Sequence, residues 1–133
     1  MGWHYYLIYL CMKTNEVLVI DDDNDLCRII TAILRCPVHV EHTLTKAEVY
    51  LVGFKPLVIL LDNNLPDGKG IEFIKEILKV YPDIKIILMT SDSSEGLKEK
   101  AYDEGAVSFI AKPFKASLLN EVLGSICPDL KAA

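Results

Sequence analysis

The sequence has too few basic residues, and no apolar run long enough, for several broad classes of protein. Lysine and arginine number 14 against 19 aspartate and glutamate residues, which gives a formal net charge of −5. Nucleic acids and anionic membranes select basic surfaces, so binding to either by this chain alone is disfavoured. A membrane-spanning helix needs about 20 apolar residues, and the apolar stretch at the start, MGWHYYLIYLC, is shorter than that.

Cysteine is sparse as well, and its spacing excludes the usual frameworks. No C-x-x-C pair occurs, and a disulfide scaffold is typical of small secreted chains, so we predict reduced thiols in a cytoplasmic protein. His39 and His42 lie at an odd spacing in VHVEHT, which reads as a strand and would place them on opposite faces, away from a shared metal. The four cysteines are Cys11, Cys27, Cys36 and Cys127.

The chain is predicted to form one domain, because 133 residues can bury a single sizeable core. The first eleven residues lack the basic region and the cleavage site of a secretory signal. We expect residues 1–15 to be an extension that the fold does not require. The alternative is a tail that docks on a membrane surface or a partner. The domain is expected over 16–127, with a tail at 128–133.

From residue 16 onward, short apolar runs alternate with segments of helical periodicity. Strands each followed by a helix predict an α/β fold with a parallel sheet covered on both faces. Continuous apolar strands fit that double burial. The segment 45–53 reads as a short helix or helical turn, and 94–105 as a weak, polar helix that ends at a glycine. The predicted strands are 17–20, 38–43, 57–61, 84–89 and 107–111.

Acidic residues follow the first of these strands directly, in VLVIDDDND. In open parallel sheets, ligands bind beyond the carboxyl ends of the strands, and that edge would also gather Asp62, Thr90 and Lys112. Several carboxylates without a basic residue among them suit Mg²⁺, whereas a lysine and a hydroxyl suit phosphoryl oxygens. An aspartate between the cation and the lysine can act as a nucleophile toward phosphorus. Asp23 or Asn24 is expected to cap the next helix.

Four motifs in this order resemble the receiver domains of two-component response regulators. They are VIDDD, then DNNLPDGKG with proline four and glycine eight residues after Asp62, then MTS, then the Lys-Pro of AKPF. The resemblance covers residues 16 to about 126. It implies a flavodoxin-like, doubly wound five-stranded parallel sheet in the order 2-1-3-4-5.

The resemblance also implies a role for each matching residue at the acidic end of the site. Asp62 would be the phosphoacceptor, and Asp21 and Asp22 would hold Mg²⁺ together with Asp62 and the backbone carbonyl of Asn64. Mn²⁺ would substitute for Mg²⁺. The donor would be a sensor histidine kinase or a phosphotransfer protein. Such a domain catalyses its own phosphotransfer and autodephosphorylation without being a classical enzyme.

At the other end of the site, the resemblance implies a conformational switch. Lys112 and Thr90 would bind the phosphoryl group, and Phe109 would rotate inward with the threonine. Phe109 has no hydroxyl where the family often has tyrosine, so the switch would work through packing alone. Pro113 would follow a cis peptide bond with Lys112, since X–Pro bonds adopt cis at low cost.

Two residues are expected to set the lifetime of the phosphorylated state. Asn64 and Asp92 stand two residues past the acceptor and two past the threonine. Both are small and polar, so we expect water to reach the phosphoryl group readily. The second helix departs from the family by looking short and irregular.

Three other functions are alternatives to this one. A haloacid-dehalogenase-like phosphatase needs an aspartate as general acid where Asn64 stands, and asparagine cannot exchange that proton. A flavin- or nucleotide-binding module needs a phosphate-cradling loop after the first strand, where three aspartates would repel phosphate. The main alternative is a pseudo-receiver, an interaction module that is not phosphorylated, but this chain keeps the acceptor, the acidic residues and the lysine. The cognate kinase, the output and the oligomeric state are not readable from the sequence.

Overall fold

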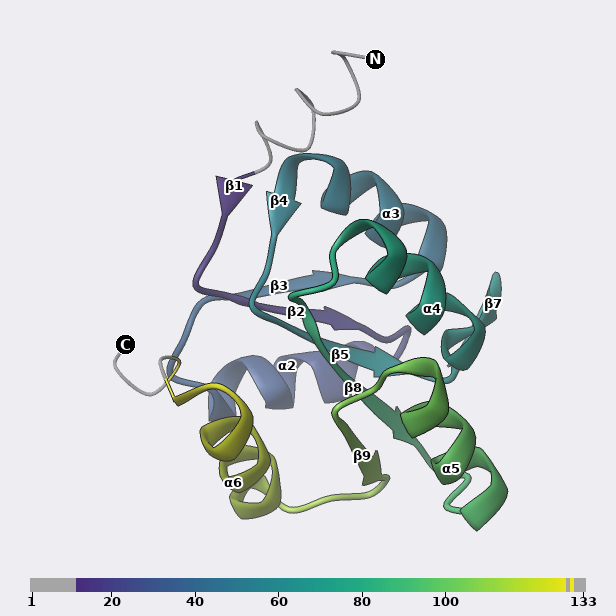
Figure 1. Cartoon of the computed structure of the whole chain (residues 1–133). Coiled ribbons are helices and arrows are strands. Elements are labelled where there is room, and N and C mark those ends of the chain that lie inside the picture. The colour runs from purple at the N-terminus through teal and green to yellow at the C-terminus, as the bar shows by residue number, and fades with distance from the viewer. Residues whose placement is uncertain (1–11, 129, 131–133) are drawn as a thin grey trace.

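A computed structural model of the chain describes residues 12–128 and 130. Its centre is a five-stranded parallel sheet in the order β3-β2-β5-β8-β9 (Figure 1), which confirms the predicted order 2-1-3-4-5. Each main strand lies within one or two residues of its prediction. The strands are β2 (Val17–Ile20), β3 (Val38–Glu41), β5 (Val58–Asp62), β8 (Lys85–Thr90) and β9 (Ser108–Ala111).

Within the described residues, five helices cover the two faces of this sheet, so the fold has three layers (Figure 1). Alternate side chains of β5 explain the arrangement, because Ile59 and Leu61 pack with α3, α4 and α5, whereas Val58 and Leu60 pack with α2 and α6. Both faces of the central strands are thus buried, which is why their sequences are continuously apolar. The helices are α2 (Asn24–Ile33), α3 (Leu44–Gly53), α4 (Gly70–Val80), α5 (Glu95–Glu104) and α6 (Ala116–Ile126).

The structure confirms the short second helix predicted over 45–53 to within one residue, but the helix is not irregular. Helix α3 is a regular helix of 10 residues, and the Thr43 hydroxyl caps it by accepting a hydrogen bond from the Lys46 backbone N–H. Its periodicity is weak in the sequence because Val49 and Val52 are apolar yet exposed. The irregular pattern therefore reflects an unusual outer face rather than a broken helix.

Residues on both sides of the expected domain, 16–127, contact it. Strand β1 (Met12–Lys13) pairs in parallel with β4 (Phe54–Lys55), and the Thr14 backbone N–H donates to the Lys55 carbonyl at 3.0 Å. Residues 12–14 therefore belong to the fold, whereas residues 1–11 lie outside the described part of the chain. At the other end, Leu130 of the expected tail is buried in the core beside α2 and α6.

Two further observations concern membrane segments and thiols. Over residues 12–128 and 130, no helix is long and apolar enough to cross a membrane. Cys27, Cys36 and Cys127 are free thiols, as predicted, and Cys11 lies outside the described residues.

Helix α4 begins unusually close to the end of β5. The Gly70 backbone N–H donates to the Asn63 carbonyl at 2.9 Å. A Cβ atom placed on Gly70 would lie 2.2 Å from the Asp62 carbonyl oxygen, which is inside van der Waals contact. Glycine at this position therefore allows the helix to approach the backbone of the predicted acceptor.

We expect Gly70→Ala to destabilise the protein by roughly 1–3 kcal/mol, because the added methyl group forces backbone apart in a packed region. Gly96→Ala is the matched control, since a Cβ at Gly96 meets nothing within 4 Å. It should be neutral or stabilising by up to about 1 kcal/mol. Urea unfolding of the two variants checks this, and equal stability of the pair would contradict the close approach at Gly70.

Candidate functional site

The carboxyl ends of four strands bring the predicted site residues together. Asp21 follows β2, Asp62 ends β5, Thr90 ends β8, and Lys112 follows β9. Asp21 and Thr90 are fully buried, and Asp62 is 5% exposed. Buried carboxylates are costly unless they are paired or bind a cation, so their position calls for a partner.

Lys112 is that partner for two of the carboxylates. Its Nζ atom donates to Asp21 Oδ2 at 2.6 Å and to Asp62 Oδ1 at 3.0 Å. Its backbone N–H donates to the Thr90 carbonyl at 2.9 Å, which ties the end of β9 to β8. The Lys112–Pro113 peptide bond is cis, as the sequence analysis expected.

The electrostatics of Asp62 and Lys112 reflect this arrangement. Burial raises the pKa of Asp62 and the Asp21 charge adds to the rise, while the hydrogen bond from Lys112 opposes it. Burial alone would lower the pKa of Lys112, but its hydrogen bonds to Asp21 and Asp62 outweigh burial and raise it. The lysine therefore stays protonated. Its single positive charge does not balance the negative charges of the carboxylates beside it.

Three carboxylates fit the donor set of a hard divalent cation. Asp21, Asp22 and Asp62 each offer an oxygen, and these oxygens lie within 4.8 Å of one another. Asp22 is exposed, so the cluster opens to solvent on one side. Mg²⁺ binds through one or two carboxylates and retains water, which suits a half-open cluster of this kind. The carbonyl of Asn64 as a further ligand stays a prediction.

The neighbouring aspartate has a structural role. Asp23 is the N-cap of α2, where its carboxylate accepts hydrogen bonds from the backbone N–H groups of Asp25 and Leu26. Its own backbone N–H donates to Asp21 Oδ1 at 3.0 Å. The cap expected from the sequence is thus confirmed, and it also orients Asp21.

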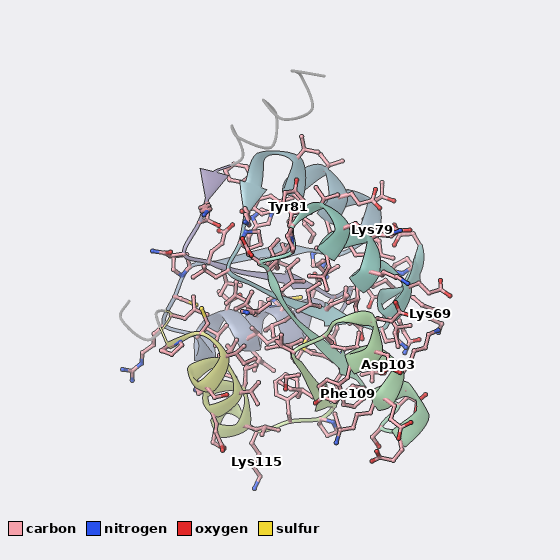
Figure 2. All side chains as sticks on the ribbon, viewed as in Figure 1. Lys69, Lys79, Tyr81, Asp103, Phe109 and Lys115 are labelled. Carbon is pink, nitrogen blue, oxygen red and sulfur yellow. The ribbon has the colours of Figure 1, made fainter. Side chains whose placement is uncertain are left out.

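The predicted switch residues lie on neighbouring strands. The Thr90 hydroxyl accepts a hydrogen bond from the Asp92 backbone N–H at 3.1 Å, and Asp92 Oδ1 accepts one from the Ser94 backbone N–H at 3.0 Å. Phe109 is half-buried on β9 and packs against the core cluster that includes α4 and α5 (Figure 2). The loop after β8 is therefore hydrogen-bonded to the hydroxyl that would meet a phosphoryl group.

Asn63 has a role that its place in the sequence does not indicate. This buried residue donates its backbone N–H to the Met89 carbonyl at 3.1 Å, and its Oδ1 accepts from the Ile71 backbone N–H at 3.0 Å. Asn63 thus joins β5, β8 and the start of α4 directly beside Asp62. No pattern in one sequence distinguishes such an asparagine from a loop residue.

The same is true of Asp67. It lies in the turn between the short strands β6 (Asn64–Leu65) and β7 (Gly68–Lys69). Its carboxylate accepts hydrogen bonds at 2.9 Å from the backbone N–H groups of Leu44 and Thr45, at the start of α3. Pro-Asp-Gly has the sequence of an ordinary turn. The sequence therefore does not indicate that Asp67 caps the distant helix α3. This cap fixes the loop that carries Asn64.

The comparison with protein families settles what kind of domain this is. The model of the response regulator receiver domain matches residues 17–124. The chain belongs to this family. Phosphorylation-activated signalling in two-component systems is the general function of such receiver domains.

Curated relatives place this receiver domain among response regulators. The KDP operon transcriptional regulatory protein KdpE of Escherichia coli is 34% identical over 102 residues, which are 74% of this chain and 45% of that protein. The chemotaxis protein CheY of Thermotoga maritima is 36% identical over 72 residues, 54% of this chain and 60% of that protein. The chain thus spans about half the length of these relatives.

Solved structures show the same fold. The beryllofluoride-activated NtrC4 receiver domain dimer has a TM-score of 0.82 at 30% identity, and the alignment covers 88% of this chain and 99% of that one. A CheY-like receiver domain protein from Methanospirillum hungatei has a TM-score of 0.81 at 23% identity, with 89% and 97% covered.

Asp67→Asn tests the cap that holds the site loop of the receiver domain. Hydrogen bonds from the Leu44 and Thr45 backbone hold the pKa of Asp67 below its ordinary value of 3.8. A lowered folded-state pKa adds stability above the unfolded pKa, and that stability is lost as the pH falls toward the folded value. We therefore expect Asp67→Asn to lower stability at neutral pH and to lower it by less at about pH 3.

Urea unfolding of wild type and Asp67→Asn at both pH values measures the difference. Asp103→Asn, on the exposed surface of α5, is the control for loss of one carboxylate. A loss of stability that is equal at neutral and acid pH would contradict a charge-dependent cap.

Proposed function

We propose that Asp62 accepts a phosphoryl group from the phosphohistidine of a sensor histidine kinase or a phosphotransfer protein. The observation that carries this proposal is the contact of Lys112 Nζ with Asp62 and Asp21, opposite a cluster of three carboxylates that fits Mg²⁺. The free thiols of the domain favour a cytoplasmic compartment, where such thiols stay reduced.

The transfer needs a nucleophile and charge neutralisation. A carboxylate oxygen of Asp62 attacks phosphorus, the new P–O bond forms as the P–N bond breaks, and the imidazole nitrogen keeps the electron pair. Mg²⁺ held by Asp21, Asp22 and Asp62 would supply positive charge to the phosphoryl oxygens. Lys112, already 3.0 Å from Asp62 Oδ1, is placed to donate to another phosphoryl oxygen.

Thr90 and Phe109 would transmit the effect of phosphorylation from the site to the rest of the domain. A phosphoryl oxygen on Asp62 offers the Thr90 hydroxyl an acceptor, and turning toward it would change the hydrogen bond from Asp92. Phe109 would then repack against the α4 and α5 side of the core. Phosphorylation shifts this equilibrium only by the contacts that differ between the two states.

The direct test is incubation with Mg²⁺ and acetyl phosphate, followed by intact mass spectrometry. Wild type and Asp103→Asn should gain the mass of one phosphoryl group in the presence of Mg²⁺ and not in its absence. Asp62→Asn should gain none. Beryllofluoride binding is measured in the same samples, because a phosphoryl group that is hydrolysed rapidly would leave no added mass. Failure of both reactions on folded wild type would favour the pseudo-receiver, a domain that acts by binding alone.

The phosphorylated state should be short-lived. Asn64 and Asp92 are both exposed beside the site, so neither covers the phosphoryl group from water. After removal of the donor, we expect the added mass to disappear well within hours, and more slowly in Asn64→Phe, whose ring would cover the acceptor. An adduct that persists for many hours in wild type would contradict open access of water.

A further inference from the structure

Helix α3 has an apolar outer face that its place in the fold does not explain. Val49 is 70% exposed and Val52 is 62% exposed, and Phe54, which follows the helix, is 40% exposed. A surface helix normally carries polar residues on the side away from the core, as α3 does at Lys46 and Glu48, so the exposed valines stand out. This face therefore lacks its cover among the described residues.

The apolar surface continues into a groove between α3 and α4. The groove has a volume of about 340 Å³, and Tyr81 bridges its two walls by donating from its hydroxyl to the Leu51 carbonyl (Figure 2). Val80, at the α4 side, is 46% exposed. Glu48 and Glu76 add negative charge to the lining. The apolar lining is Leu51, Val52, Phe73, Ile77, Val80 and Tyr81.

The pairing of β1 with β4 places Met12 beside the residue that follows α3. Strand β1 runs parallel to β4, with Met12 opposite Phe54 and Lys13 opposite Lys55. In a parallel pair, the residues that precede Met12 approach from the same side as the residues that precede Phe54. Those residues are the last turn of α3, including Val52. The first eleven residues thus join the fold beside the uncovered face.

The chemistry of residues 1–11 suits the groove. MGWHYYLIYLC is apolar and aromatic and contains no acidic residue, so it adds no negative charge to a groove that two glutamates line. An extended segment spans about 3.3–3.6 Å per residue, so eleven residues reach more than 30 Å. Helix α3, with 10 residues, is only about 15 Å long.

We propose that residues 1–11 dock intramolecularly on the groove between α3 and α4 and cover the exposed side chains of Val52 and Val80. Docking removes apolar area from water on both partners, and the short tether through β1 raises the effective concentration of the segment. An anionic membrane is a poorer occupant, because Glu48 and Glu76 lie at the groove and the chain carries a net charge of −5.

Trp3 gives this proposal a direct readout, because it is the one tryptophan in the sequence. Tryptophan emission and acrylamide quenching are measured on the full chain at low micromolar concentration. The variants are Val52→Lys and Val80→Lys, which place charge on the two sides of the groove. The control is Val107→Lys, because Val107 is 40% exposed and precedes β9, outside the groove.

The proposal predicts blue-shifted, protected emission in wild type and in Val107→Lys, at all protein concentrations. Val52→Lys and Val80→Lys should shift the emission to the red and raise quenching several-fold toward that of free tryptophan. Circular dichroism confirms that each variant is folded, and Val52→Thr and Val80→Thr serve as milder substitutions if a lysine variant is not.

Four results would overturn the proposal. Trp3 in wild type could be quenched as readily as free tryptophan. Alternatively, its emission could be the same in wild type and in both groove variants. Protection could depend on protein concentration and coincide with a dimer in light scattering, which would make a second copy the occupant. Protection could also arise only with vesicles of anionic lipid, which would make the segment a membrane tail.

Discussion

The contact of one ammonium group with two buried carboxylates organises the functional edge of this domain. Lys112 Nζ lies 2.6 Å from Asp21 and 3.0 Å from Asp62, and without it the repulsion between these groups would oppose the fold. With Asp22, three carboxylates and one ammonium leave two negative charges at the cluster. A divalent cation would balance them, and an anionic phosphoryl group could then approach Asp62.

The fold supports this contact from several directions at once. Parallel strands present their carboxyl ends at one edge, which is where ligands bind in open α/β sheets. Asn63 links β5, β8 and α4 beside the acceptor, and Gly70 lets α4 approach the Asp62 backbone. Asp67 fixes the following loop to the start of α3. The site is therefore built on backbone that is hydrogen-bonded on each side.

Much of this arrangement was predictable because its signals are local or follow from sheet topology. The apolar run 17–20 coincides with β2, and the meeting of Lys112 with the aspartates follows from four strands that end at one edge. The roles of Asn63 and Asp67, the regularity of α3 and the pairing of residues 12–14 were missed. The roles of Asn63 and Asp67 and the pairing of residues 12–14 depend on contacts between distant segments, such as Asp67 with Leu44, that one sequence does not encode in a pattern. Helix α3 looked irregular because Val49 and Val52 are apolar yet exposed.

Calorimetric titration of Mg²⁺ into wild type, Asp21→Asn and Lys112→Met tests the central claim most directly. In this account, the carboxylates bind the cation and the positive charge of Lys112 weakens this binding. Wild type should then bind one Mg²⁺, and Asp21→Asn should bind it at least tenfold more weakly. Lys112→Met should bind it more tightly than wild type. The gain in Lys112→Met follows from removing a competing positive charge from the cluster. Equal affinity in all three proteins, or no binding to wild type, would contradict the account.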